Sequence, residues 1–303
     1  MGDYSKDVEL KALFEEMVNV CALYQSHRMF VYLSVLQIFH SLFVDTEAPE
    51  RFALRPVEDV IKEAESILAS YESDSIYQHL RILVDYVNFE YYLKFGVKRK
   101  AQAILNSIDK DIPRLLLHYG NYTFPAQVLE SKLKMLIGTP QIEELHYDNI
   151  NQFENYKDNS GSIPAKIVYY VYRALSSYYR SRYADAYRWM YDLTNEVNLK
   201  EHQKTLLEIR SLMAFFKLMD KDAEVFKLNL GSAQRLLRQI GKEEAGHLAT
   251  FVKLLSVAKS DVTSTKAEKA AKLIDQLKDH EITQFQPTLL IEWEPRVLAK
   301  FKG

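Results

Sequence analysis

The side chains that could hold a metal ion are scattered along this chain. Its eight histidines form no HExxH pair and no other short metal-ligand spacing, and a single cysteine, Cys21, excludes a cysteine cluster. Glu143, Glu144 and His146 stand close together, but no second set of ligands follows them. Cys21 lies in an apolar helical stretch, where a thiol is usually a small buried side chain. We therefore expect no metal site and no cofactor.

Motifs for nucleotide binding and for nucleophilic catalysis are missing as well. The sequence has no Walker motif, no Gly-rich dinucleotide turn and no GxSxG elbow. The carboxylate pairs Glu15-Glu16 and Glu243-Glu244 are expected on solvated helix faces, which offer no desolvating pocket for acid-base chemistry. We predict no catalytic residues and a non-enzymatic protein. The alternative is a helical-bundle enzyme whose site is assembled from residues far apart in the sequence.

An aromatic segment, YYVYRALSSYYRSRYADAYRWMYDL (169–193), is the first candidate for a binding surface. It holds eight tyrosines, one tryptophan and four arginines. Helical periodicity assigns most of its rings to two core-facing stripes. The first stripe consists of Ile163, Ile167, Tyr170, Val171, Ala174 and Tyr178, and the second of Tyr183, Ala186, Tyr187, Met190, Tyr191 and Thr194. Most of this segment is therefore expected to be interior.

The aromatic and arginine residues outside these stripes are the remaining candidates for ligand binding. They are Tyr169, Tyr172, Arg173, Arg180, Arg188 and Trp189. Exposed Trp, Tyr and Arg side chains dominate the binding energy of protein interfaces. Two interpretations stay open: these residues pack against neighbouring helices, or they form an exposed aromatic-basic surface suited to a peptide or an acidic partner.

A second candidate surface is basic. The stretch SAQRLLRQIGK (232–242) places Arg235, Arg238 and Lys242 along one side of a helix. Arginine pairs well with phosphate and carboxylate groups, so these residues could form a patch for phosphate or for an acidic partner. The competing interpretation is a solvated helix face with cations placed favourably near the C-terminal end of the helix.

Long helices joined by short connections must position these residues. Nine glycines and eight prolines in 303 residues are few for a chain rich in β-turns. Apolar residues recur with the helical period, and no run alternates convincingly as a strand would. The main helices are expected at 56–72, 74–95, 97–108, 163–181, 183–197, 200–219, 221–240, 243–259 and 263–279.

The longest apolar run, 29–44, raises the question of a membrane. It is slightly short for a bilayer and carries Gln37 and His40, so a central helix buried on most sides explains it better. The N-terminal stretch MGDYSKDVEL has no apolar core of the kind that a signal peptide needs. We expect no membrane association and a cytoplasmic protein.

The distribution of charge suggests two regions. Residues 1–160 carry 16 Lys and Arg against 24 Asp and Glu, a formal charge of −8, whereas residues 161–303 carry 23 against 17, a charge of +6. The stretch DNSGSIP (158–164) has the composition of a linker and coincides with this change of sign. We therefore expect an acidic helical region at 1–157 and a basic one at 158–303, or else one continuous array.

A recurring pattern connects three stretches of the chain. In each, an aromatic pair ends one helix, a short polar or basic turn follows, and a new helix opens with charge and Ala. The stretches are EYYLKFGVKRKAQAI (90–104), SYYRSRYADAYRWM (177–190) and AFFKLMDKDAEVFKL (214–228). Tyr178 and Phe216 stand 38 residues apart, a period typical of two-helix repeats.

With this pattern the sequence resembles the tetratricopeptide family. Tyr170, Ala174 and Tyr178, followed by Tyr183 and Ala186, match the places of that motif, whereas Arg173 and Leu193 depart from it. The resemblance covers about a third of the chain. It implies an all-α protein in which antiparallel hairpins stack as a right-handed α-solenoid, with the region 158–303 as its tetratricopeptide-like part.

These observations lead to a functional expectation. We expect a scaffold for protein-protein interaction that binds a protein or peptide on its concave or aromatic-basic surface. The alternative is a nucleic-acid-binding module that uses the basic half of the chain and whose affinity falls steeply with salt. The excess of basic residues is small for a nucleic-acid binder, which makes this the weaker alternative.

Overall fold

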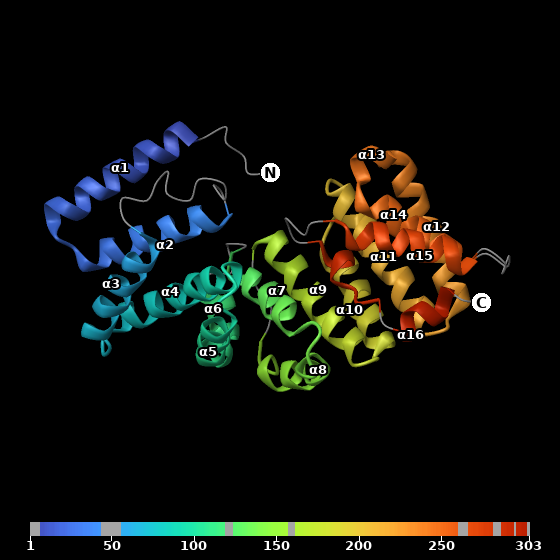
Figure 1. Cartoon of the computed structure of the whole chain (residues 1–303), viewed down its shortest axis with the longest axis horizontal. Helices are drawn as coiled ribbons and strands as arrows, with labels where there is room; N and C mark the ends of the chain where they lie inside the picture. The colour runs from blue at the N-terminus through green and yellow to red at the C-terminus, as the bar shows by residue number, and fades with distance from the viewer. Residues whose placement is uncertain are drawn as a thin grey trace. The chain divides into compact units, whose positions relative to one another are not determined.

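The computed structural model describes residues 7–43, 56–118, 124–156, 161–259, 266–280, 286–293 and 295–301. All regular structure in these ranges is helical, as the periodicity predicted, and they contain no β-strand. The chain divides into two compact units, Met1–Gly120 and Asn121–Gly303 (Figure 1).

The regular structure of the first unit is helical in its described residues. Its elements are α1 (Asp7–Tyr24), α2 (His27–Phe43), α3 (Val57–Ser70), α4 (Ser75–Lys94), α5 (Lys98–Ile108), the 3-10 turn η2 (Asp109–Asp111) and α6 (Ile112–His118). Two side-chain hydrogen bonds join α3 and α4: Tyr91 Oη donates to Glu58 Oε1 at 2.6 Å, and Asn88 Nδ2 donates to Glu65 Oε1 at 3.1 Å.

The apolar run at 29–44 forms most of α2. Val31 and Ile38 are fully buried, while Leu36 remains 45% exposed, so the helix is buried on most of its sides. Lys94 of α4 donates a hydrogen bond from Nζ to the carbonyl oxygen of Leu42 at 2.8 Å. In the described part of the chain, no helix is both long enough and apolar enough to cross a membrane.

The second unit begins with α7 (Phe124–Leu136) and α8 (Gln141–Gln152). It continues with α9 (Ile163–Tyr179), α10 (Tyr183–Glu196), α11 (Gln203–Met219), α12 (Ala223–Ile240), α13 (Lys242–Ala245), α14 (His247–Lys259) and α15 (Lys266–Lys278). The unit ends with η3 (Pro287–Leu290), α16 (Pro295–Leu298) and η4 (Ala299–Phe301). The single helix expected at 243–259 is broken at Gly246, which has a left-handed φ of +56°.

A chain of aromatic rings forms the centre of the second unit. Tyr178 of α9 contacts Phe215 of α11 with ring centroids 5.4 Å apart, and Phe215 contacts Phe251 of α14 at 5.9 Å. All three rings are fully buried. Tyr178 and Phe216, which the sequence places 38 residues apart in equivalent positions, contact each other at 5.9 Å. These contacts join α9 to α11 and α11 to α14.

The three stretches that share a sequence pattern also share one turn geometry. The turns α4–α5, α9–α10 and α11–α12 each have a central residue with positive φ, namely Gly96 (+74°), Ser181 (+62°) and Lys221 (+63°). In each turn, the next residue donates its amide to a carbonyl five residues back. These bonds are Val97 to Tyr92 at 2.8 Å, Arg182 to Ser177 at 2.8 Å and Asp222 to Lys217 at 3.1 Å. This pattern is the Schellman motif, which satisfies carbonyl groups at a helix C-terminus.

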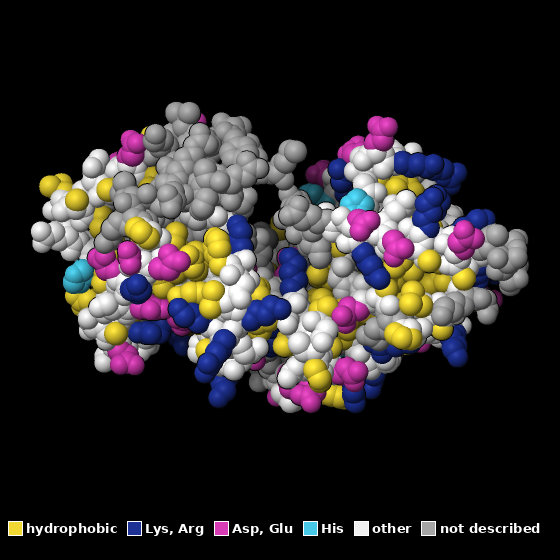
Figure 2. All heavy atoms as spheres, in the orientation of Figure 1, with side chains coloured by type: hydrophobic (Ala, Val, Ile, Leu, Met, Phe, Trp, Pro, Cys, Tyr) yellow, Lys and Arg dark blue, Asp and Glu magenta, His cyan; other side chains and the backbone are white. Residues whose placement is uncertain are grey.

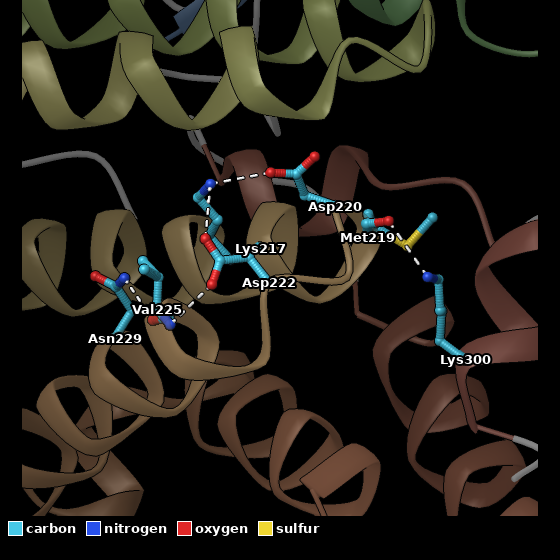
Figure 3. A network of polar contacts seen from close by, with 7 residues as sticks. All are labelled: Lys217, Met219, Asp220, Asp222, Val225, Asn229 and Lys300. Carbon is cyan, nitrogen blue, oxygen red and sulfur yellow. Dashed lines mark hydrogen bonds and ion pairs between the residues drawn. The ribbon is translucent and has the colours of Figure 1, made fainter.

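The α11–α12 turn is further held by charged side chains (Figure 3). Lys217 Nζ lies 2.9 Å from Asp220 Oδ2 and 3.2 Å from Asp222 Oδ2. Asp222 also caps α12, because its Oδ1 accepts a hydrogen bond from the Val225 amide at 3.2 Å. This amide bond, followed by the bond with Lys217, lowers the pKa of the Asp222 carboxyl. The turn therefore has a fixed geometry.

The predicted boundary at 157/158 lies inside the second unit. Residues 157–160 fall outside the described part, and α8 and α9 on either side of them pack against each other. With the division at 120/121, the first unit carries 13 Lys and Arg against 18 Asp and Glu, a charge of −5, and the second carries 26 against 23, a charge of +3. The charge contrast between the compact units is thus smaller than between the two predicted regions.

Candidate functional site

The aromatic segment lies where α9 is flanked by α8 and α10. Three polar contacts join α8 to α9: Glu143 with Arg180 at 3.3 Å, His146 with Ser177 at 3.1 Å, and Asn149 with Tyr172 at 2.8 Å. The residue numbers rise along α8 while those of the partners fall along α9. The two helices are therefore antiparallel. Burial lowers the pKa of His146, which favours the neutral ring in this interface.

Arg173 occupies the centre of an aromatic cage on this face. Its guanidinium carbon lies 4.4 Å from the ring centroid of Trp189, 5.6 Å from that of Phe153 and 5.7 Å from that of Tyr169. One nitrogen donates a hydrogen bond to the Tyr169 hydroxyl at 2.7 Å. Within the described residues, this half-buried cation has no carboxylate partner. Aromatic faces stabilise it instead.

Tyr169 and Tyr172 are not available to a ligand. Tyr169 is buried between Phe153, Tyr156 and Trp189. Tyr172 is 1% exposed, and its hydroxyl donates to Asn149 Oδ1. An exposed surface at these two tyrosines is therefore excluded, because α8 covers the face of α9 from which they project. For both of them, the interpretation as packing residues is the correct one.

The other candidates of the aromatic segment do not form a common surface. Trp189 is half-buried against Tyr170 and Arg173. Arg180 is exposed, pairs with Glu143 and lies over the ring of Tyr147 at 5.2 Å. The side chain of Arg188 is 80% exposed and lies 3.9 Å from Asp192 on its own helix. A peptide-binding surface made of all six residues is not present.

An open groove lies between α12, α14 and α15. Its volume is 670 Å³, and its apolar lining comes from Leu237, Ala249, Val252 and Leu273. Polar side chains continue the lining, among them Gln234, whose Nε2 donates to Ser256 Oγ at 2.9 Å. Figure 2 shows apolar, basic and acidic side chains interspersed on the visible face of the second unit. We call this groove the basic groove.

The charged residues lining the basic groove are all cations: Arg238, Lys242 and Lys253. Among the described residues, none of these three cations forms an ion pair with a carboxylate. Arg238 donates from Nε to the carbonyl oxygen of Gln234 on its own helix at 3.3 Å. Arg235, the third residue of the predicted patch, is exposed but does not line the groove. Two of the three predicted residues thus come together with a third cation from α14.

Lys253 was not among the residues predicted for this surface. The sequence does carry a signal for it, since Thr250, Lys253 and Ser256 recur every three residues within the apolar stretch of α14 and all three line the groove. A polar stripe in an otherwise apolar helix indicates a face that no other helix covers. Only the packing of α14 beside α12 places this stripe next to Arg238.

A polar cluster around Thr288 has the residue types of a nucleophile and its base. Thr288 Oγ1 donates to Glu208 Oε1 at 2.9 Å, and His247 Nε2 lies 3.1 Å from the same hydroxyl. Glu208 does not contact the other ring nitrogen of His247, where the carboxylate of a catalytic triad would bind. Because Thr288 is 1% exposed, a substrate has no access to its hydroxyl.

The described residues contain no group of three or more His, Cys, Asp and Glu side chains arranged to hold a metal ion. No protein-family model, no curated protein and no solved structure matches the chain significantly.

Proposed function

We propose that this chain is a non-enzymatic protein-binding protein built from tetratricopeptide-like helical hairpins. The Schellman turns at Gly96, Ser181 and Lys221 support the repeat interpretation, because three equivalent sequence stretches adopt the same hairpin geometry. The contacts that join α9 to α11 and α11 to α14 are what a stack of hairpins requires. In this proposal the helices form a right-handed α-solenoid in the second unit.

The basic groove is the proposed binding site, and its occupant is an acidic segment of another protein. The observation that carries this proposal is a set of three cations that have no carboxylate partner among the described residues and surround an apolar floor. A partner segment with Asp or Glu beside apolar side chains would satisfy both features: the carboxylates pair with Arg238, Lys242 and Lys253, and the apolar side chains cover Leu237, Val252 and Leu273.

The same features favour a protein over a nucleic acid. Phosphate groups would pair with the three cations, but they would not bury the apolar side chains of the groove floor. Proteins that bind single strands stack bases on aromatic side chains, and the lining of the basic groove contains no Phe, Tyr or Trp. The nucleic-acid alternative therefore explains only part of the groove.

A peptide selection on the intact chain tests the proposal. A random peptide library should become enriched in sequences that combine Asp or Glu with Leu, Ile, Val or Phe. The affinity of a selected peptide should fall by about tenfold or more with Lys253→Glu, because a repelling carboxylate replaces an attracting cation. Arg188→Glu, at an exposed position of α10, is the matched control and should leave the affinity unchanged.

The outcomes that contradict the proposal are specific. Selection of sequences without acidic residues, or equal binding to Lys253→Glu, would remove the basic groove as the site. Salt-sensitive binding of single-stranded RNA or duplex DNA that Lys253→Glu abolishes, without any selected peptide, would establish the nucleic-acid alternative instead.

A further inference from the structure

The last part of the chain lies against α9, α11 and α14. This C-terminal segment (residues 286–293 and 295–301) follows α15 and forms only short helical turns. It crosses the second unit in Figure 1 as the red trace that ends near α16. Four of its apolar side chains are buried: Leu290, Ile291, Val297 and Phe301. The segment therefore packs on a surface formed by α9, α11 and α14.

Side chains of the helices hold the main chain of this segment. Glu208 Oε1 of α11 accepts a hydrogen bond from the Thr288 amide at 3.1 Å in addition to the bond from its hydroxyl. The hydroxyl of Tyr179 on α9 donates to the carbonyl oxygen of Leu290. Bonds from a groove to the main chain of a bound segment are one means by which grooves bind peptides of different sequence.

An aromatic pocket holds the centre of the segment. Trp293 lies against Phe215 of α11 and Phe251 of α14, with ring centroids 6.4 and 6.2 Å apart. A tryptophan packed on a pair of aromatic rings is typical of the anchor residues of peptide ligands.

Two cations of the segment bind the C-terminal ends of the helices. Arg296 lies over the Tyr178 ring and donates to Ser181 Oγ and, at 3.4 Å, to the carbonyl oxygen of Tyr179 at the end of α9. Lys300 Nζ donates to the carbonyl oxygen of Met219 at the end of α11 at 3.3 Å (Figure 3). Each cation satisfies a carbonyl group at the negative end of a helix dipole.

We propose that the face formed by α9, α11 and α14 is a second peptide-binding groove and that the C-terminal segment is its intrachain ligand. The partner that displaces it is a protein segment of the same chemistry. This partner carries a hydroxyl residue in the place of Thr288, apolar residues at Leu290 and Ile291, tryptophan at Trp293 and a cation at Arg296. None of the residues that line the basic groove contacts the C-terminal segment in the bonds and ring contacts described above, so this proposal does not rest on the basic groove.

Cutting the connection to the segment tests whether it is a separable ligand. A protease recognition sequence is inserted between His280 and Gln286 of the full chain, which folds with the segment in place and is then cleaved. We expect the cleaved protein to keep its helical circular dichroism, to release the segment on dilution and to bind a fluorescent synthetic peptide of residues 286–303 with saturation. Replacing Trp293 in that peptide by Ala should weaken its binding by about tenfold or more.

Substitutions in the body of the protein show whether the peptide returns to the same groove. Glu208→Ala should weaken peptide binding, whereas Glu208→Gln, which keeps an acceptor oxygen, should retain most of the affinity. Lys253→Glu should have no effect on this peptide, which separates a failure here from a failure of the basic groove. The proposal is overturned if release of the segment unfolds the protein, or if the cleaved segment never exchanges with added peptide.

Discussion

Arg173 lies over the indole ring of Trp189, with its guanidinium carbon 4.4 Å from the ring centroid. In the sequence both residues are candidates for ligand binding, and in the structure they bind each other. The contact joins α9 to α10 at the level where α8 also packs on α9 through Phe153. Arg173 is thus a residue that stabilises the packing of three helices.

Replacing Arg173 by Met should destabilise the second unit. The substitution keeps an unbranched apolar stem but removes the cation–π contacts and the hydrogen bond to Tyr169, so we expect a loss of about 1–2 kcal/mol in the free energy of unfolding. Urea denaturation measures this loss. Arg188→Met on α10 is the control and should change the stability by less than about 0.5 kcal/mol. Equal effects of both variants would contradict the role assigned to the cage.

The hydrogen bond between Tyr172 and Asn149 should also contribute to stability. Tyr172→Phe leaves the Oδ1 atom of Asn149 buried without this donor, and the Nδ2 atom of Asn149 already has no hydrogen-bond partner within the described residues. We expect a loss of about 1–3 kcal/mol in thermal or urea unfolding. Tyr191→Phe, at a ring that is 48% exposed, should be neutral. A neutral Tyr172→Phe variant would mean that this bond contributes nothing.

The positive φ shared by the Schellman turns predicts that glycine is favourable at the equivalent positions. Introducing glycine should therefore stabilise the protein, and removing it should destabilise the protein. Lys221 adopts a φ of +63°, which is unfavourable for a side chain with a Cβ, so Lys221→Gly should stabilise the second unit by about 0.5–1 kcal/mol. Gly96 adopts +74° with open space around it, so Gly96→Ala should destabilise the first unit by about 1 kcal/mol through backbone strain alone. Melting temperatures measure both effects. If the two variants shift the melting temperature in the same direction, the shared turn geometry is contradicted.

Asp85 makes the stability of the first unit dependent on pH. Burial raises the pKa of its carboxyl to about 6, with Arg81 opposing the rise and Glu65 adding to it. Because this value lies above that of the unfolded chain, the ionised carboxylate destabilises the folded state above pH 6. As the pH falls through about 6 toward 4, the folded state takes up the proton first and gains stability.

Asp85→Asn tests this dependence. The variant should be more stable than the parent chain at about pH 7.5, by about 1–3 kcal/mol, and the difference should shrink toward about pH 4. Urea titrations at the two pH values measure it, with Glu16→Gln, at an exposed position of α1, as the control. A difference that is constant with pH would exclude Asp85 as its source.

Local patterns in the sequence predict the helices well. The stretch 183–197 was expected as one helix and forms α10 from Tyr183 to Glu196, and the stretch 221–240 forms α12 from Ala223 to Ile240. The exception is 243–259, which breaks at Gly246 because its backbone there is left-handed. Helical period and capping residues are properties of neighbouring residues, so they can be read without knowledge of the fold.

The outcome at the candidate sites depends on contacts between distant residues. Periodicity places Tyr172 outside the apolar stripe of its helix, yet it is buried because Asn149 and the rest of α8 cover that side. Arg238 and Lys242 form a groove only where Lys253 and Leu273 approach from other helices. Neither result follows from a pattern within one helix.

The sequence by itself therefore determined the all-helical class and the positions of most helices, since hydrogen bonding and side-chain periodicity act over a few residues. The tertiary structure alone decided which of the off-stripe residues are covered and which face solvent. It also decided that the C-terminal segment lies against α9, α11 and α14. The physical reason is that the exposure of a side chain depends on whether an element distant in the sequence covers it. Which element covers which surface is decided only when the helices pack and bury their apolar side chains.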